Sequence, residues 1–324
     1  MRPWGAKPRL IAAAVAAVVA VIVLVTSAVT QSAPLRDGDQ TRGERAQDGQ
    51  MPSDQVPGDQ AQNFAAPPAP PAPPPGPRLV APAEPDDITA GASLFGWALL
   101  DRTTRATTGS SNRDRVYNTM ESMIKPWIAA DYLRRLTESG DEPSETVLRE
   151  LALTIIDSND PLAEKYYRIG GSDAVVSRMI EICDLESVRI KPSLWSWTEM
   201  TPLDAVRYGE CLGDGRAAGA EWTDWLLAQM RAVRGGVADQ KSGEVQGGRW
   251  GIIDGLPAPL AEQTGIKNGW TQYRDGWHVN CLGVHEDWVL AIMIRTTRGL
   301  QAAADICEDV TERLVVHPDR LSGR

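Results

Sequence analysis

A proline-rich stretch divides this chain into a part that cannot build a core and a part that can. Residues 66–77 read APPAPPAPPPGP, and the surrounding segment is polar or rich in proline and alanine. Such a segment buries too little apolar surface to offset the entropy of ordering it, and its prolines favour an extended, semi-rigid chain. We therefore predict a disordered linker over residues 31–90 and one domain over residues 91–324, which is long enough to bury a substantial core.

A mostly apolar run of 20 residues, Leu10–Val29, precedes the linker. This length crosses the hydrocarbon core of a bilayer as a helix. Three basic residues stand before the run and none follows until Arg36, so the positive-inside rule predicts residues 1–9 in the cytoplasm, a membrane anchor over residues 10–30 and an extracytoplasmic domain. A cleaved signal peptide is the alternative, although its apolar core is usually shorter, about 7–15 residues.

Composition excludes several function classes. The net charge of −10 argues against a nucleic-acid partner, which would need a concentrated basic surface. Only three histidines are present, too few for most histidine-based metal sites and a weak basis for a Ser-His-Asp triad, and none of the four cysteines lies in a CxxC pair. We expect no metal, no cofactor and no nucleic acid.

The order of strand-like and helix-like segments predicts the fold class. Hydrophobic patterns and turn signals predict strands over residues 94–100, 263–273, 276–282 and 288–295, and a short strand and turn over residues 107–117. They predict helices over residues 122–135, 144–156, 172–183, 221–233 and 300–314, with one more opening at 201. Strands at both ends of the domain imply one antiparallel sheet built from distant parts of the chain, with helices on both faces.

Ser122 and Lys125 form an S-x-x-K motif at the start of a predicted helix. Pro126 is tolerated only in the first helical turn, which places Ser122 at the helix N-terminus. Residues three apart share a helix face, so the hydroxyl and the amine can meet without a histidine. A lysine acts as a base there if burial or a neighbouring cation lowers its pKa. By itself this short motif is weak evidence for a nucleophile.

Two further motifs follow along the chain. The first is Ser158-Asn159-Asp160, in a turn where a serine could relay a proton to a leaving group. The second is Lys267-Asn268-Gly269-Trp270, on a predicted edge strand. Its lysine would hold a substrate carboxylate and lower the pKa of Lys125, and its glycine permits close backbone approach. The backbone N–H groups of Trp270 and Ser122 could form an oxyanion hole.

Together, and in this order, the motifs resemble those of the penicillin-recognising serine enzymes, the class A β-lactamases and low-molecular-mass D,D-peptidases. The resemblance runs from about Leu94 to the C-terminus and includes FGWALLDRTT, SMIKPWIAADYL, IGG after the second motif, and TPLDAV. It implies the α/β sandwich of the β-lactamase/transpeptidase superfamily. It also implies a catalytic set and a substrate-binding set. The catalytic set is Ser122 as nucleophile, Lys125 as general base, Ser158 as proton relay and Lys267 as carboxylate-binding cation. The substrate-binding set is Asp160, Asn268, Gly269 and Trp270.

The sequence departs from the family pattern at four places. Glu121 precedes the serine, where a small residue is usual; the Asp-Asn pair of the second motif is inverted; and Asn268 replaces a threonine. The fourth departure is a short interval before the TPLDAV segment, with Glu186 at its start and Glu199 just beyond its end, in place of the acidic loop that activates the deacylating water in class A β-lactamases. We therefore expect a β-lactam acyl-enzyme to be long-lived.

Cysteines and tryptophans give weaker signals. Chain order suggests the disulfides Cys183–Cys211 and Cys281–Cys307, although four cysteines allow three pairings and free thiols remain an alternative. Of the eleven tryptophans, four lie near the predicted site loops and are candidates to stack on a substrate, with core packing as the alternative: Trp195, Trp197, Trp250 and Trp270, the last of them beside a motif.

These observations predict an extracytoplasmic serine hydrolase that acts by acyl transfer on cell-wall D-amino-acid peptides or another acyl substrate, and that β-lactams also acylate. The alternative is a catalytically degenerate binding or scaffold domain, and a true β-lactamase is the third reading.

Overall fold

A computed structural model describes residues 78–79, 92–241 and 247–316 of the chain. The predicted cytoplasmic segment and membrane anchor, and all of the predicted linker except two residues, lie outside these ranges. No helix within the described ranges is long and apolar enough to cross a membrane. Arg78–Leu79, which the sequence assigned to the linker, form strand β1 and pair with β10 (Val315–Val316).

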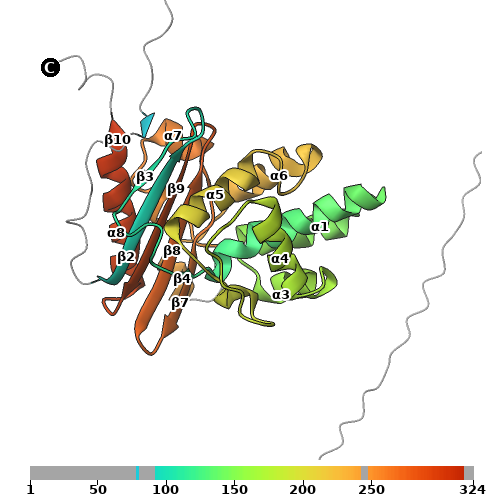
Figure 1. Cartoon of the computed structure of the whole chain (residues 1–324), viewed down its shortest axis with the longest axis horizontal. Coiled ribbons are helices and arrows are strands. Elements are labelled where there is room, and N and C mark those ends of the chain that lie inside the picture. The colour runs from blue at the N-terminus through green and yellow to red at the C-terminus, as the bar shows by residue number, and fades with distance from the viewer. Residues whose placement is uncertain (1–77, 80–91, 242–246, 317–324) are drawn as a thin grey trace, which may run out of the picture. The chain divides into compact units, whose positions relative to one another are not determined.

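One antiparallel sheet forms the centre of the domain, and both ends of the domain contribute to it (Figure 1). Its strand order is β3-β2-β9-β8-β6, and β7 also pairs with β8. The strands are β2 (Ala92–Asp101), β3 (Thr107–Gly109), β6 (Gly265–Ile266), β7 (Gly269–Tyr273), β8 (Gly276–Val284) and β9 (Trp288–Thr296). The predicted antiparallel sheet from distant parts of the chain is confirmed.

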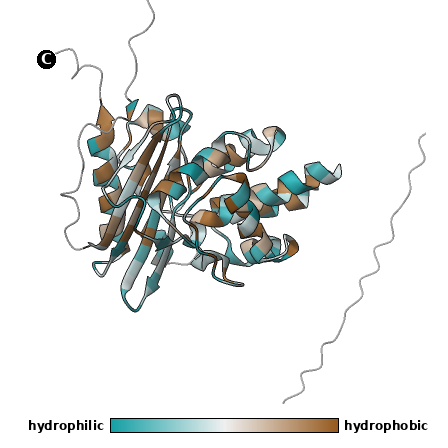
Figure 2. Cartoon of the chain, in the orientation of Figure 1, coloured by the Kyte–Doolittle hydropathy of each residue, from teal (hydrophilic) through white to brown (hydrophobic). Residues whose placement is uncertain are grey.

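Helices cover both faces of this sheet, as predicted. Helix α8 (Leu300–Leu314) packs on β8 and β9 from one side, while α5 (Pro202–Gly213) packs on β2, β8 and β9 from the other. Covering on both faces explains why β9 reads WVLAIMIRT, a nearly continuous buried apolar run rather than an alternating one. The hydropathy colouring shows the same apolar strands between the two helical layers (Figure 2).

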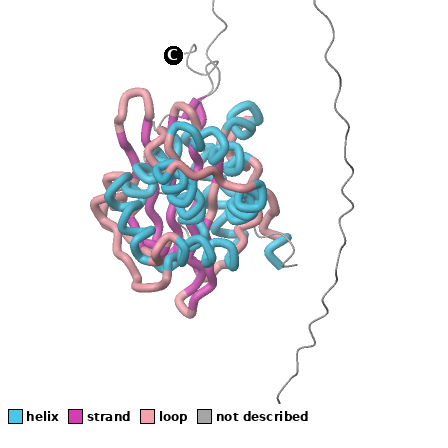
Figure 3. Tube along the Cα trace, turned by 90° about the vertical axis from the view of Figure 1, so that its right-hand side faces the viewer, coloured by secondary structure: helices cyan, strands magenta, loops and turns pink. Residues whose placement is uncertain are grey.

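The helical layer beyond α5 is organised around α1 (Lys125–Ser139). This helix packs against α2 (Glu145–Ile156), α3 (Asp160–Ile169), α4 (Asp173–Ile182) and α6 (Ala220–Arg231). The view turned by 90° shows these helices gathered in front of the strands (Figure 3). Because neighbours surround α1 at its N-terminal half, the turn that leads into it is held rigidly.

The predicted short strand and turn over residues 107–117 are present: β3 ends at Gly109, and the polar run that follows forms turns that donate and accept local hydrogen bonds. Two other places differ from the sequence analysis. The predicted strand over residues 263–273 is interrupted, with the short helix α7 (Ala258–Gln263) before β6 and β7. Helix α3 was not predicted.

Both suggested disulfides are present. Cys183–Cys211 joins the end of α4 to α5, and Cys281–Cys307 joins β8 to α8. Each bridge therefore ties a helix to an element that lies elsewhere in the sequence, and the described residues contain no free cysteine.

Candidate active site

Ser122 lies on a single turn of 3-10 helix, η2 (Glu121–Ile124), that leads directly into α1. Pro126 occupies the first turn of α1, where its missing N–H costs nothing, as the sequence predicted. The neighbouring side chains of Met123 and Ile124 are fully buried, and the hydroxyl of Tyr208 donates to the Met123 carbonyl oxygen at 3.0 Å. Ser122 itself stays partly exposed, so the turn holds it at the surface of the core.

Ser158, in the turn before α3, is the point at which two buried lysine side chains meet. The Nζ atoms of Lys125 and Lys267 each donate to the Ser158 Oγ at 2.9 Å, and both lysines are 0 % exposed. A hydroxyl oxygen has two lone pairs, so these bonds occupy both and leave the O–H proton to donate. In the described part of the chain this proton has no acceptor, and Ser158 lines the same cleft as Ser122.

Lys125 makes three hydrogen bonds, which is the full donor capacity of an ammonium group. Besides the Ser158 Oγ, it donates to the Ser158 carbonyl oxygen and, at 2.5 Å, to a carboxylate oxygen of Asp160. Among the described residues it makes no hydrogen bond with Ser122. Ser122 and Lys125 are therefore near in sequence but not hydrogen-bonded to each other. Lys125 must lose a proton, and with it one of its three hydrogen bonds, before its amine can accept the Ser122 proton.

Burial sets the protonation of both amines. Desolvation lowers the pKa of Lys125 to about 8, against the opposing effects of Asp160 and Glu121. Desolvation, and after it the charge of Lys125, hold the pKa of Lys267 well below its ordinary value. The sequence predicted that the charge of Lys267 would lower the pKa of Lys125, whereas in the structure the charge of Lys125 lowers the pKa of Lys267.

Asn159 and Asp160, the inverted pair of the second motif, have different roles: the first caps helix α3 and the second contacts the candidate base. Asn159 is the N-cap of α3, and its side chain accepts a hydrogen bond from the Leu162 N–H at 2.9 Å. Asp160 is left at the first position of the helix, with its side chain 66 % exposed and paired with Lys125. The residue predicted to bind substrate thus holds the candidate base in the ground state.

Gly269, at the start of β7, lies against the turn that carries Ser122. A Cβ atom there would meet the Met120 carbonyl oxygen at 2.3 Å and the Ser122 nitrogen at 3.0 Å. Only glycine allows this approach, which brings the backbone at Trp270 beside Ser122, and both residues line one cleft. The arrangement suits the predicted oxyanion hole.

Asn268 does not face the cleft. Its side-chain amide donates at 2.8 Å to the carbonyl oxygens of Gly248 and Trp250, and the side chain is buried. Its Oδ1 atom has no partner among the described residues. Lys267 is also buried, so neither of the two predicted carboxylate-binding side chains is among the residues that line the cleft.

Glu121, the residue before the nucleophile, is held by a network that the sequence did not predict. Thr271 and Tyr273, on β7, donate to its two carboxylate oxygens at 2.7 and 2.8 Å. Its φ is +52°, a left-handed backbone conformation that is costly for a side-chain-bearing residue, and Ser158 has a similar φ of +55°. Glu121 therefore lines the cleft in a fixed position rather than pointing away from it.

The cleft has a volume of about 400 Å³. Ser122, Ser158, Asp160 and Trp270 were predicted to lie there; the others that line it are Glu121, Pro161, Glu164, Trp195, Ser196 and Thr271. Trp195 donates its indole N–H to Glu164 at 2.9 Å, which ties the 3-10 turn η3 (Trp195–Trp197) to α3. The described residues offer no cluster of three ligands for a metal ion.

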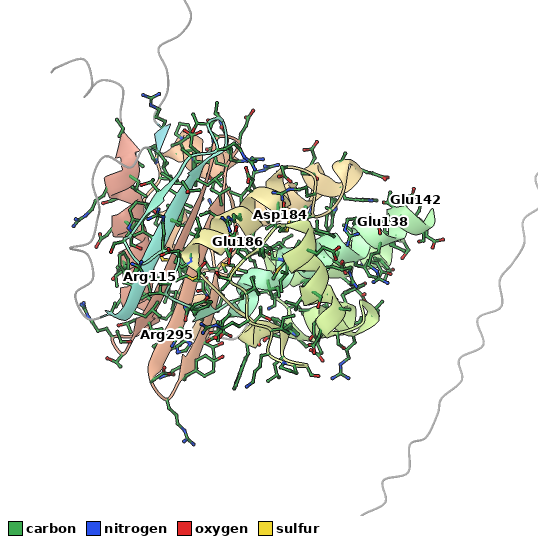
Figure 4. All side chains as sticks on the ribbon, viewed as in Figure 1. Arg115, Glu138, Glu142, Asp184, Glu186 and Arg295 are labelled. Carbon is green, nitrogen blue, oxygen red and sulfur yellow. A yellow bond between two sulfur atoms is a disulfide. The ribbon has the colours of Figure 1, made fainter. Side chains whose placement is uncertain are left out.

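The two glutamates that flank the short interval before β5 (Glu199–Met200) are not among the residues that line the cleft. Glu186 pairs with Arg207 and Glu199 lies within ion-pair distance of Arg189 and Arg295. Figure 4 shows Glu186 beside Asp184, near α5, and Arg295 at the far end of the sheet. Neither glutamate is placed to activate a deacylating water.

Comparison with solved structures identifies the fold. A reconstructed ancestral class A β-lactamase of Gram-negative bacteria superposes with a TM-score of 0.54 at 16 % identity, over 70 % of this chain and 95 % of that chain. A β-lactamase from Xanthomonas campestris gives 0.53 at 17 % identity, over 70 % and 93 %. L2 in a complex with relebactam gives 0.52 at 17 %, over 72 % and 92 %. No protein-family model and no curated protein matches the sequence. The described domain has the β-lactamase/transpeptidase-like fold, and at this identity the likeness extends to the fold alone.

Proposed function

Given this fold, we propose that the chain is an extracytoplasmic serine hydrolase that acts by acyl transfer through Ser122. The proposed substrates are D-amino-acid peptides of the cell wall. The apolar run before the linker supports a membrane anchor, with the domain outside. The single observation that carries the proposal is the meeting of Ser122, Ser158 and two buried lysines at one cleft, with both amines on the Ser158 hydroxyl.

In the proposed acylation, the Ser122 Oγ attacks the substrate carbonyl carbon and its proton passes to the neutral Lys125 amine. The backbone N–H groups of Ser122 and Trp270 stabilise the oxyanion. The Ser158 hydroxyl then gives its proton to the leaving nitrogen as the C–N bond breaks, and the Lys125 ammonium re-protonates Ser158. A water molecule later hydrolyses the ester and restores Ser122.

The supply of neutral amine limits this scheme at neutral pH. With a pKa of about 8, roughly one Lys125 side chain in ten is neutral at pH 7. The Asp160 carboxylate, 2.5 Å from the Lys125 Nζ, also stabilises the protonated amine. We therefore expect acylation to speed up as the pH rises through about 8.

Deacylation of β-lactam adducts should be slow. The candidate water-activating glutamates of the interval before β5 are paired with arginines outside the cleft. This favours a peptidase-like enzyme over a true β-lactamase.

A catalytically degenerate binding domain is the second candidate function. Two observations favour it: Lys125 is saturated by hydrogen bonds that exclude Ser122, and Glu121 places a carboxylate beside the nucleophile. In this case the same cleft would bind a peptide without cleaving it.

Intact-mass spectrometry separates these candidates. The full-length chain, in a non-ionic detergent, is incubated with a penicillin and separately with a fluorophosphonate, beside the Ser122→Ala variant. A stable adduct of either reagent on the wild type alone supports the acyl-transfer proposal. If neither reagent modifies folded protein, as judged by circular dichroism, the hydrolase proposal fails and the binding-domain proposal stands.

A further inference from the structure

Trp195 lies at the boundary between the cleft and the buried amine of Lys125. We propose that Trp195 is a positioning residue for acyl transfer, whose indole keeps water away from Lys125 and so keeps that amine available as a base. This inference rests on the proposed function, since it concerns the base that serves the same nucleophile. It gives Trp195 a role other than stacking on a substrate, the possibility raised by the sequence.

The first argument is the position of the indole. Its ring centroid lies 5.6 Å from the Nζ atom of Lys125. Trp195 lines the cleft and is 8 % exposed, whereas Lys125 does not line it and is 0 % exposed. The indole is therefore part of the cover that separates the amine from the water of the cleft.

The second argument is that the turn η3, which carries this indole, is held at three points. The indole N–H donates to Glu164 on α3 at 2.9 Å. Directly after the turn, the carbonyl oxygen of Thr198 accepts from the Met120 N–H at 2.7 Å. Trp197 packs edge-on against Tyr273 of β7, with ring centroids 5.8 Å apart. Contacts to both α3 and β7 thus hold the indole in place over the amine.

Burial of the amine is the property that the indole would maintain. Desolvation is the largest influence on the pKa of Lys125 and lowers it from 10.5 to about 8. The charged groups that face the amine are Asp160 from α3, Glu121 from η2 and Lys267 from the segment before β7. None of them changes when Trp195 is replaced, so a shifted pKa in such a variant reports the loss of the indole.

Loss of the indole has two opposite effects on the pKa of Lys125. Water admitted to the amine would reverse part of the desolvation, which can shift the pKa of a buried lysine by about 3–5 units. The ring also attracts the ammonium, but 5.6 Å is near the outer limit of about 6 Å for this contact, so we take its contribution as less than about half a unit. Hydration of the amine therefore dominates, and we expect a net rise of about one unit.

The pH dependence of acylation in Trp195→Ala tests the proposal. The rate constant is measured on the full-length chain, in a non-ionic detergent, with the uncharged ester p-nitrophenyl hexanoate from pH 6 to pH 10. The alkaline limb should move up by about one pH unit, so that the rate at pH 7, relative to the same protein at pH 10, falls about eightfold below that of the wild type. This ratio is independent of any general loss of activity.

Two conservative variants and one control accompany it. Trp195→Phe keeps a ring over the amine, and its limb should stay within about 0.3 pH units of the wild type. Trp195→Leu shortens the cover and keeps an apolar side chain there, so its limb should move up by less than in the alanine variant. The matched control is Trp222→Ala, which removes a half-buried tryptophan of α6 whose indole N–H also donates to one side chain, Thr137, at 3.1 Å. Its limb should not move.

A second measurement needs no acyl transfer. Reductive methylation with formaldehyde and cyanoborohydride modifies amines that the reagents can reach, and peptide mass spectrometry locates the methyl groups. Exposed Lys191 is the internal standard. Lys125 should stay unmodified in the wild type and in Trp195→Phe, and should react in folded Trp195→Ala, with folding judged by circular dichroism.

The outcomes are distinct for the two proposals. A limb that stays in place in Trp195→Ala while the rate falls at every pH would overturn the inference and leave the hydrolase proposal intact. A limb that moves down would overturn it as well, because the attraction of the ring for the ammonium would then outweigh desolvation. Protection of Lys125 from methylation in folded Trp195→Ala would show that other residues exclude the water. Failure of the ester to acylate the folded wild type would overturn the proposed function, and the role of Trp195 in acylation with it.

Discussion

Replacing Asp160 with asparagine should free Lys125 to act as a base at neutral pH. The carboxylate lies 2.5 Å from the Lys125 Nζ and raises its pKa, although burial dominates and keeps that pKa near 8. An opposite charge in contact shifts a pKa by about 1–3 units, and because the Asp160 side chain is 66 % exposed we take the lower end, about one unit. Asp160→Asn should therefore lower the pKa of Lys125 to about 7.

A lower pKa of Lys125 should speed acylation at neutral pH. The neutral amine rises with pH through the pKa, so at pH 7 its fraction goes from about one tenth in the wild type to about one half in the variant. Acylation at pH 7 should be about fivefold faster, the alkaline limb should move down by about one pH unit, and the two proteins should agree above about pH 9.5. Asp160→Asn should cost about 1.5 kcal/mol of stability at pH 7, about 0.5 from the first turn of α3 and about 1 from the lost attraction to the buried Lys125 ammonium.

The assay is the acylation rate constant with an uncharged ester, p-nitrophenyl hexanoate, from pH 6 to pH 10. Asp184→Asn is the matched control, because it makes the same change in an exposed ion pair with Arg216, outside the cleft (Figure 4). An alkaline limb that stays in place, or that moves to higher pH in Asp160→Asn, would refute the assignment of Lys125 as the titrating base.

Three further predictions concern stability. Because the folded pKa of Lys125 is about 8 and the unfolded value is 10.5, its amine binds more protons in the unfolded chain between these values. The wild type and Lys125→Met share the tyrosines and Lys267, so the difference between their free energies of unfolding should change with pH across that window in favour of the wild type, by at most about 3 kcal/mol, in denaturant titrations at pH 7.5 and pH 10.5. Gly269→Ala should lose acylation and about 2 kcal/mol or more of stability, since its Cβ would meet a backbone oxygen at 2.3 Å, whereas Gly236→Ala, with its nearest neighbour at 3.8 Å, should stay within about 0.5 kcal/mol in thermal melts. Replacing both Cys281 and Cys307 with alanine should cost about 3.5 kcal/mol, the loop-closure value for a separation of 26 residues; a loss below about 1 kcal/mol in urea titration would contradict that reasoning.

The elements that could be predicted from sequence are those fixed by local rules. Pro126 belongs in a first helical turn, and it located the helix that carries the nucleophile to within a few residues. Strand β9 was recognisable in the sequence as a mostly apolar run, and eight of its nine residues are buried. Helix α3 was missed although its signals were present, with Asn159 as a cap and Pro161 in the first turn.

The site could be predicted only as far as its motifs. Which way a side chain turns depends on residues far away in sequence: Glu121 is oriented by Tyr273, and Asn268 by the carbonyl oxygens of a separate loop. Glu164 and Trp195 enter the cleft because a short interval packs against α3, and no motif marks either of them. The sequence motifs thus predicted which residues form the site, whereas the orientation of their side chains and the other residues of the cleft depend on tertiary packing and were not predicted.

The left-handed backbone at Glu121 and Ser158 has a consequence for directed evolution. Each of these conformations costs about 1–2 kcal/mol in a residue that carries a side chain, and glycine would relieve most of it. A laboratory selection for heat resistance alone would therefore favour glycine at Glu121, whereas glycine at Ser158 would also remove the oxygen that accepts from two buried lysines. Selections that demand turnover at elevated temperature should retain the strained Ser158 and gather their stabilising changes elsewhere in the domain.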